Sequence, residues 1–462
     1  MAEKKLPAIF SYFPEVSVPT QKVVPFKEKL KWTLIILVAF FVLGLIPLFG
    51  LGQNALQQFE YLSIILGAEF GSMISLGIGP IITASIILQL VVGAGLLKID
   101  INTPDGRKYY EGLQKILSLA FIILEAMLYV YTGGLAPNAG IPNFGIMRLV
   151  LVFQLFLGGL LIMFMDEVTT KWGFGSGISL FIAAGVSKSL FISALSPMKS
   201  PANPSVFIGR IPMLFKSLIE GDVQTAVLMF LAVFFTVAIF VLAVYVQAMK
   251  VEIPLSFGRV RGYGIRWPLN FIYTSNIPVI LVAALMANVQ LFARLFQNWG
   301  RPILGTFVGN TPSTGIVAWM NAPNIVQKLV TGSMTGLDWA HALVYMLFMI
   351  VGAVIFSIFW VQTSGMDSHS QAKQIMASGL QVPGFRRDER VLERILDRYI
   401  FPLTIMGAIA VGFLAALADV SGALSRGTGI LLAVMIIYQF YEKIAKEHAM
   451  DMNPLIKKFI KT

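Results

Sequence analysis

The chain has 462 residues, of which 56% are hydrophobic and only 13% are charged, and its formal net charge is +11. Because a soluble protein typically has about 25% charged residues, this composition excludes an ordinary soluble protein. The sequence contains no cysteine, which excludes disulfides, thiol chemistry and metal sites with cysteine ligands.

The N-terminal segment, residues 1–30, is polar, interrupted by proline and lysine-bearing. It therefore lacks the apolar core of a cleavable signal peptide, and we expect the first membrane span to direct insertion. The stretch "PFKEKLKWT", residues 25–33, is amphipathic. We expect it to lie along the cytosolic face of the membrane.

Apolar runs of about 20 residues recur along the rest of the chain, and each can cross about 30 Å of hydrocarbon as a helix. The predicted fold class is an all-α integral membrane protein with ten transmembrane helices. The predicted spans are 31–50, 73–97, 113–133, 147–165, 175–195, 223–247, 271–295, 339–361, 399–418 and 428–446.

A short helical element is predicted between the first two spans, in "FEYLSIILGAEFGSMISLGIGP", residues 59–80. Its apolar core runs only from Tyr61 to Leu66 and is too short to cross a bilayer. Glu60 and Glu69 stand on either side, and glycines follow at positions 67, 71, 77 and 79. The residues alone leave two interpretations open, a re-entrant or interfacial element and a movable stopper.

The positive charges predict the orientation of the chain. If the N-terminus is cytosolic, the loops 98–112, 166–174, 248–270 and 362–398 and the C-terminal tail 447–462 share its side. Most of the 35 lysines and arginines fall there, as the positive-inside rule requires. We therefore expect both termini to be cytosolic.

The ten spans divide into halves of five, residues 31–222 and 223–446. An odd number of spans gives the two halves opposite orientations. The second span of the first half contains "GIGPIITASII" and that of the second half contains "SNIPVILVAAL". Inverted repeats with interrupted helices are typical of proteins that move something across a membrane, so the pattern indicates a transporter or a channel.

Catalysis is not expected, and neither is a metal or a cofactor. The three histidines are isolated in the sequence, and no H-E-x-x-H, G-x-S-x-G or nucleotide-binding P-loop element occurs. Glu125 is the clearest acidic residue inside a predicted span. It is either an ion or proton site or a neutral, hydrogen-bonded group between helices, and both interpretations stay open.

Two predicted cytosolic loops concentrate arginine around flexible glycines. They contain "MKVEIPLSFGRVRGYGIRWPLN", residues 249–270, and "VPGFRRDERVLERILDR", residues 382–398. These charges are either ordinary orientation signals or a docking surface for a polyanion, since arginine binds phosphate groups through charge and forked hydrogen bonds.

Several long motifs in order closely resemble the SecY family, the large subunit of the Sec protein-conducting channel, with the archaeal branch nearest. They are "LGIGPIITASIILQL", "GFGSGISLFIAAGV", "VEIPLSFGRVRG" followed by "SNIPVI", and "GFRRDER". The resemblance covers nearly the whole chain. It implies two halves that open like a clamshell around an hourglass pore, a waist of apolar side chains, a plug helix, and a lateral gate into the lipid.

The resemblance also assigns site residues. It assigns the pore ring to Ile78, Ile82, Ile178, Ile182, Ile280 and Leu432. It assigns the plug, within 60–70, to Glu60, Tyr61, Leu62, Ile64, Ile65, Leu66, Gly67, Glu69 and Phe70. It assigns the lateral gate to Thr83, Glu125 and Asn288. It assigns ribosome binding to Lys250, Arg259, Arg261, Arg266, Arg386 and Arg387.

Elementary physics is compatible with these assignments without requiring them. Ile78 with Ile82, and Ile178 with Ile182, are i, i+4 pairs that share a helical face, although such pairs commonly face lipid or pack between helices. A narrow ring of isoleucine offers no hydrogen bonds, so it dewets and resists ion conduction. Polar contacts between gate helices are worth about 1 kcal/mol each, which an apolar signal helix can displace.

The implied function is passage of unfolded secretory polypeptides across the cytoplasmic membrane and sideways release of membrane helices into the lipid bilayer. The implied partners are SecE-like and Sec-beta-like small membrane subunits, the ribosome as the energy source, signal sequences and nascent polypeptides. Two alternatives stay open: a secondary transporter of small solutes, which needs a compact polar site at the membrane midplane, and an integral membrane enzyme, which needs convergent catalytic groups.

Overall fold

The computed structural model consists mainly of long α-helices. It describes residues 15–20, 24–52, 71–93, 96–97, 99, 103–131, 133–138, 140, 143–200, 203–257, 264–274, 277–298, 300–308, 311–377, 380–381, 388–424 and 427–452.

Each of the ten predicted spans coincides with one long helix. These helices are α1 (Phe26–Leu45), α3 (Gly79–Gly93), α4 (Pro104–Tyr131), α5 (Phe144–Trp172), α6 (Gly177–Leu195), α8 (Val223–Ala248), α9 (Ile277–Asn298), α12 (Gly336–Thr363), α14 (Glu389–Val420) and α15 (Gly427–Met452). Within the described residues, eight helices are long and apolar enough to cross a membrane. The two predicted spans outside that set correspond to α1, which begins with several charged residues, and to the shorter apolar helix α3.

Several helix starts differ from the prediction, by as much as nine and ten residues at α4 and α14. The helix α1 begins at Phe26, so most of the amphipathic stretch 25–33 forms its first turns without a break before the span. The second span was predicted to be helical from residue 73, and this was wrong, because α3 begins only at Gly79. Residues 71–78 form successive turns, in which Gly71 and Gly77 have positive φ angles of 88° and 56°. A right-handed helix excludes such angles.

Shorter elements fill the connections. They are the helices α7 (Arg210–Glu220), α10 (Gly315–Trp319), α11 (Ile325–Val330) and α13 (Ser368–Ala377), and the strands β1 (Lys199–Ser200), β2 (Asn203–Phe207), β3 (Lys250–Phe257), β4 (Gly264–Asn270), β5 (Phe307–Val308), β6 (Thr311–Pro312) and β7 (Leu380–Gln381). The strands form the antiparallel pairs β1–β2 and β5–β6 and one three-stranded antiparallel sheet with the order β4–β3–β7.

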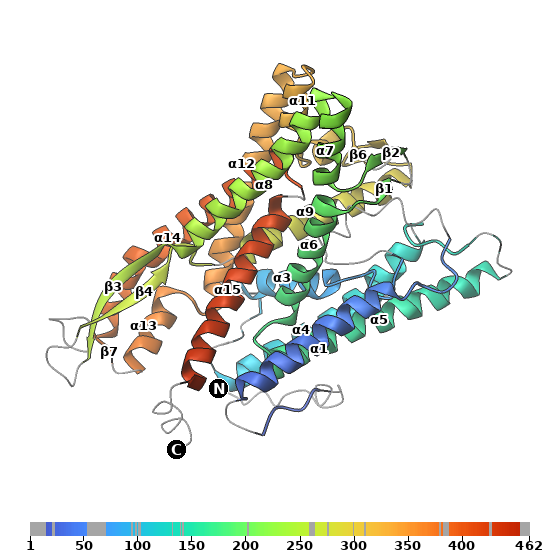
Figure 1. Cartoon of the computed structure of the whole chain (residues 1–462). Coiled ribbons are helices and arrows are strands. Elements are labelled where there is room, and N and C mark those ends of the chain that lie inside the picture. The colour runs from blue at the N-terminus through green and yellow to red at the C-terminus, as the bar shows by residue number, and fades with distance from the viewer. Residues whose placement is uncertain are drawn as a thin grey trace.

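The helices pack as two groups that meet along α3, α6 and α15. In the N-terminal group, α5 packs against α1 and α4, and α4 packs against α3, so these helices run side by side in Figure 1. In the C-terminal group, α12 packs against α9 and α14. The groups meet where α15 packs against α6 and where α3 packs against α9 and α12. The sheet lies at one end of the C-terminal group, and α7 and α11 lie at the other (Figure 1).

The same local arrangement occurs once in each group. A non-helical segment precedes α3 and another precedes α9, and each packs its backbone against a glycine of the fourth long helix in its group. That glycine is Gly158 of α5 in the first group, against Met73, and Gly407 of α14 in the second, against Phe271. A repeat of five helices predicts such a recurrence.

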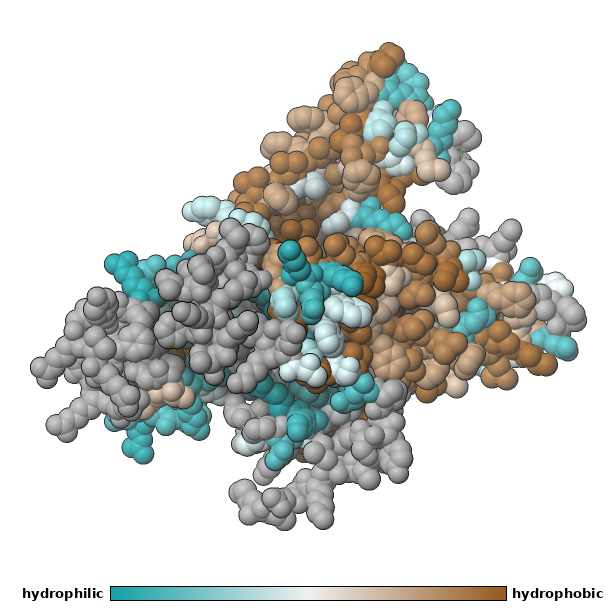
Figure 2. Space-filling view, turned by 60° about the horizontal axis from the view of Figure 1, so that its bottom comes forward, coloured by the Kyte–Doolittle hydropathy of each residue, from teal (hydrophilic) through white to brown (hydrophobic). Residues whose placement is uncertain are grey.

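Much of the outer surface is apolar. Large hydrophobic side chains such as Phe230, Phe234 and Val237 of α8 are each more than half exposed. Figure 2 shows hydrophobic surface over the upper arm and the right side of the molecule, with hydrophilic residues gathered below. A lipid-facing surface has this composition.

Candidate functional site

The six predicted ring residues lie at the beginnings of four helices. Ile78 immediately precedes α3, and its carbonyl accepts a hydrogen bond of 3.1 Å from the amide of Ile82. Ile178 and Ile182 lie in the first turns of α6. Ile280 lies in the first turn of α9, and Leu432 lies in the second turn of α15.

The structure brings all six into one hydrophobic cluster drawn from both helix groups. Ile78, Ile82, Ile182 and Leu432 are buried members of the cluster, and Ile178 and Ile280 are partly buried and pack against it. The same cluster contains many other apolar residues of both groups, so membership in it does not by itself single out these six.

Buried Glu125 and partly buried Thr83 of the predicted gate form a polar pair between α3 and α4. The Thr83 hydroxyl oxygen lies 3.2 Å from Oε1 of Glu125 and 2.9 Å from the carbonyl oxygen of Gly79. Glu125 is only 6% exposed. A hydroxyl has one proton, so a protonated Glu125 that donates to Thr83 satisfies both contacts, because Thr83 then donates to Gly79.

The third predicted gate residue, Asn288, lies on α9 in the other helix group. Among the described residues it has no hydrogen bond to Thr83 or Glu125, and both of these belong to the first group. Its neighbour Ala287 is 3% exposed and packs into the cluster that contains Ile122 and Ala126 of α4. The described contact between α4 and α9, at the seam between the two helix groups, is therefore apolar.

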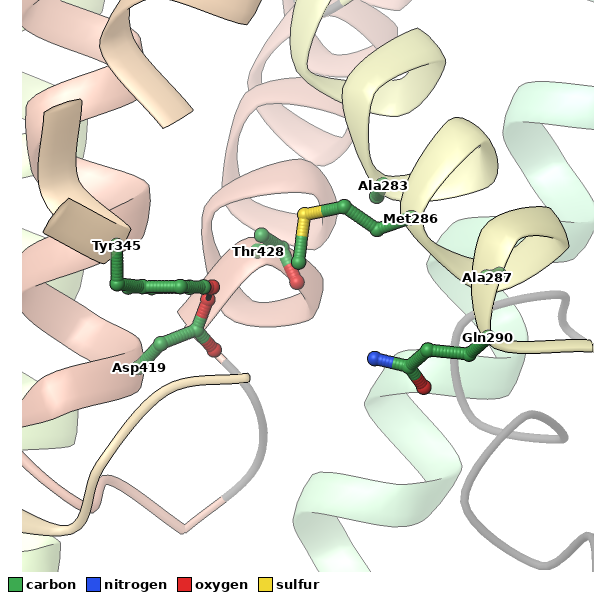
Figure 3. Close-up of a pocket in the computed structure, with 7 residues that line it drawn as sticks. All are labelled: Ala283, Met286, Ala287, Gln290, Tyr345, Asp419 and Thr428. Atoms are coloured by element: carbon green, nitrogen blue, oxygen red, sulfur yellow. Dashed lines mark hydrogen bonds between the residues drawn. The ribbon is translucent and has the colours of Figure 1, made fainter. Parts of the chain in front are cut away.

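A small cavity with a mixed polar and apolar lining lies beside α9, and no sequence pattern predicted it. Its lining is Ala283, Met286, Ala287, Gln290, Tyr345, Asp419 and Thr428. The Tyr345 hydroxyl donates a 2.6 Å hydrogen bond to Asp419, and Figure 3 shows the Gln290 amide directed across the cavity toward Thr428 and Asp419. The volume is about 10 Å³, close to the least that holds one water molecule. A solute does not fit.

The sequence offered one partial signal for this cavity. Asp419 is an acidic residue at the end of a long apolar segment, but it lies one position beyond the predicted span 399–418. Tyr345, Gln290 and Thr428 lie on three other helices. These residues come together through tertiary packing, which no local sequence pattern predicts.

The predicted ribosome-binding residues divide into described and undescribed sets. Lys250, at the start of β3, forms a 2.9 Å ion pair with Glu442 of α15, which raises the pKa of Lys250. Arg266 of β4 has an 80% exposed side chain and pairs with Glu252 at 3.0 Å. The remaining four, Arg259, Arg261, Arg386 and Arg387, lie outside the described residues.

No strand was predicted in the cytosolic loops that contain the arginines, but the structure forms a sheet there. β3 pairs with β4 over seven residue pairs, from Lys250↔Asn270 to Ser256↔Gly264. β7, which follows α13, pairs with the far end of β3 through Ser256↔Gln381 and Phe257↔Leu380. One sheet therefore connects the two loops.

The predicted plug, residues 60–70, lies outside the described residues. The described residues after it begin at Gly71, with the turns that lead to Ile78. Among the described residues, no group of histidine, aspartate and glutamate side chains is arranged to hold a metal ion.

Comparison with known proteins agrees with this architecture. The family model described as SecY matches residues 72–441. The chain is 44% identical over 465 residues to "Protein translocase subunit SecY" of Methanothermobacter thermautotrophicus, covering 99% of each chain.

Two solved structures have the same fold. "The structure of a protein conducting channel" superposes with a TM-score of 0.83 at 40% identity, over 98% of this chain and 99% of that one. "Sec61 in the Canine ribosome-channel complex from the endoplasmic reticulum" has a TM-score of 0.80 at 39% identity, over 98% and 99%. This chain is therefore a multi-pass membrane protein that belongs to the SecY family and is of the archaeal type.

Proposed function

We propose that this chain is the pore-forming subunit of a protein-conducting channel, with halves 31–222 and 223–446. It passes unfolded polypeptides across the membrane and releases apolar helices sideways into lipid. The observation that carries the proposal is the match of nearly the whole chain to the SecY family, and the convergence of the six ring residues into one apolar cluster is consistent with it. The similarity to a structure described as a protein conducting channel supports it.

The ring acts as a seal without sequence preference. Ile78, Ile82, Ile178, Ile182, Ile280 and Leu432 are branched and apolar, so a constriction built from them excludes water and hydrated ions. They also form no hydrogen bonds, so an extended chain of any sequence slides past without a specific binding site. Because the ring residues come from both halves, moving the halves apart widens the constriction.

The lateral gate lies between α3 and α4 on one side and α9 and α12 on the other. The packing of α3 against α9 and α12, and of Ala287 into the cluster of α4, represents the closed gate. In this proposal the Thr83–Glu125 hydrogen bond holds α3 and α4 together as one side of the gate, and Asn288 faces them from the other side. A signal helix opens the seam by replacing apolar contacts with its own.

Residues 60–70 serve as the plug. The apolar core from Tyr61 to Leu66 matches an apolar ring, and the glycine-containing turns from Gly71 to Ile78 attach the plug to α3. In the sequence, the proposed plug therefore precedes the turns that lead to the ring residue Ile78.

The sheet β4–β3–β7 and its two arginine loops form the ribosome-docking surface. Exposed Arg266 and the loop residues Arg259, Arg261, Arg386 and Arg387 supply the charge that phosphate groups bind. The similarity to a channel in a ribosome complex supports this role. Lys250 contributes less, because its side chain is paired with Glu442 and is only 36% exposed, against 80% for Arg266.

The remaining parts of the proposal follow from the same assignment. The complex resides in the cytoplasmic membrane with both termini in the cytosol, and two small membrane subunits, SecE-like and Sec-beta-like, complete it. The chain performs no catalytic step, and the driving force comes from the ribosome.

Reconstitution tests the proposal. The purified complex is placed in sealed lipid vesicles and supplied with ribosomes translating a secretory protein, and protection of the product from added protease is measured. We expect a product with a signal sequence to be protected and one without it to be digested. Digestion of both products, in vesicles whose channel is folded and correctly oriented, would refute the function.

A further inference from the structure

The segment from Gly71 to Ile78 connects the predicted plug to the predicted ring without forming a helix. Turn hydrogen bonds shape it, from the amide of Ser75 to the carbonyl of Ser72 at 3.0 Å and from Gly77 to Ile74 at 2.9 Å. It is also buried, with Ile74, Leu76 and Ile78 each at most 1% exposed. A non-helical segment this deep in the molecule needs fixed neighbours to hold its place.

One set of neighbours follows the end of α1. The amide of Met73 donates to the carbonyl of Ile46 at 2.9 Å, and the amide of Leu48 donates to Gly71 at 2.8 Å. Pro47 and Ser72 form an isolated antiparallel β-bridge. These bonds fix the beginning of the segment. Its distance from the neighbouring helices is set by packing.

The other neighbour is the backbone of α5 at Gly158. A β-carbon added there would overlap the carbonyl oxygen of Met73 and lie 2.8 Å from its carbonyl carbon. The obstacle is backbone, which cannot rotate away as a side chain does. At the adjacent Gly159, by contrast, an added β-carbon meets only the side chain of Ile122, at 2.7 Å.

We propose that Gly158 is a positioning residue of the channel seal: it lets α5 approach the backbone at Met73 and thereby sets the position of the ring residue Ile78. The inference rests on the proposed function and adds a residue outside the ring, the plug and the gate. A larger side chain at position 158 pushes the segment 71–78 away from α5, and Ile78 moves with it.

The second helix group contains the same arrangement. A β-carbon added at Gly407 of α14 would lie 2.7 Å from the carbonyl oxygen of Phe271 and 3.2 Å from Cα of Ile272. These residues belong to the segment that precedes α9 and its ring residue Ile280. In both halves, therefore, a glycine allows close packing of the backbone segment that precedes a ring residue.

The experiment compares three single substitutions on the same helix, in the whole complex with its small subunits. Gly158→Ala places a β-carbon against the backbone of Met73, and Gly159→Ala places one against the side chain of Ile122. Gly145→Ala adds a β-carbon where nothing lies within 4 Å. Ion conductance of the idle complex in planar bilayers is measured for each. We expect at least a tenfold higher open fraction for Gly158→Ala, a smaller rise for Gly159→Ala, because its β-carbon presses on buried Ile122 in the cluster that holds Ala287, and wild-type values for Gly145→Ala.

Cysteine accessibility distinguishes local displacement from unfolding, because the chain has no native cysteine. Ser75→Cys reports on the segment, and Ser357→Cys, equally buried on α12, reports on the fold elsewhere. In the Gly158→Ala background we expect a water-soluble maleimide to label position 75 and not position 357. Labelling of both positions would show a general role in folding and would overturn the positioning role.

A ring variant separates failure of this inference from failure of the proposed function. Ile82→Gly should conduct ions in the idle complex if the channel assignment is right. If Ile82→Gly conducts ions and Gly158→Ala conducts no more than wild type, the positioning role of Gly158 is refuted and the channel assignment is retained. If Ile82→Gly is also tight and no substrate is translocated, the proposed function itself fails.

Discussion

Replacing Ala287 with leucine tests whether the lateral gate is closed by apolar packing. Ala287 is 3% exposed and is the one described residue of the C-terminal group in the cluster that contains Ile122 and Ala126. The adjoining cavity is about 10 Å³, so it does not accommodate three additional carbon atoms. Leucine at this position therefore forces α9 away from α4.

The magnitude follows from the cost of overpacking. Extra methylene groups in a packed interior typically cost about 1–3 kcal/mol, and this cost applies to the closed seam but not to an open one. Because about 1.4 kcal/mol corresponds to a factor of ten, the equilibrium between closed and open gate should shift by about 5- to 140-fold toward open.

Two measurements check this shift. Idle ion conductance should rise, and secretory proteins with weakened signal sequences should be translocated more efficiently, because the signal no longer supplies all of the opening energy. Leu285→Phe is the matched control, since it adds bulk two residues away on a side chain that is 40% exposed. Wild-type tightness and wild-type signal dependence in a folded Ala287→Leu complex would refute apolar closure of the seam.

Deleting residues 60–70 should leave the helices folded and make the idle channel leaky in single-channel records; a deletion variant as tight as wild type would show that this segment is no plug. Glu125→Leu should lower the melting temperature by removing an interhelical hydrogen bond worth about 0.6–1.7 kcal/mol, whereas Glu125→Gln, which can still donate to Thr83, should stay near wild type. Equal loss in both variants would contradict the hydrogen-bonded role of Glu125. Combined charge reversal at Arg259, Arg261 and Arg386 should weaken ribosome binding and flatten its salt dependence, and an unchanged salt titration would exclude these residues from the contact.

Hydropathy predicted where the long helices lie, because burial in lipid depends on the composition of a run of about 20 residues. It did not predict the helix starts that local backbone geometry decides. The apolar residues from Met73 to Ile78 look helical by composition, yet Gly71 and Gly77 have positive φ angles and the segment forms turns.

The sheet in the cytosolic loops was missed for a different reason. The sequence "VEIPLSF" contains the branched and aromatic residues of a strand, but the glycines and arginines that follow were interpreted as flexibility. The partners of Gly158 and Asp419 could not be inferred at all, because Met73 and Tyr345 are more than 70 positions away in the sequence and packing alone brings them close.

The family resemblance supplied the site residues that composition could not. Ile78 and Ile82 are two isoleucines among many, and only the matching motif distinguished them from lipid-facing residues. Their common cluster with Ile182 and Leu432 is consistent with that assignment, and conductance measurements remain its direct test.

The unequal pairing in the three-stranded sheet has a consequence for hydrogen exchange. β7 is held to β3 through only two residue pairs, whereas β4 is held through seven. Local opening follows the number of contacts that must break, so β7 should detach while the β3–β4 hairpin stays intact. The backbone amides of Leu380 and Gln381 should therefore exchange with deuterium earlier than those of Val251 and Ile253. A ribosome bound to both loops should slow hydrogen exchange most in β7. The amides of Leu380 and Gln381 therefore serve as a local reporter of docking.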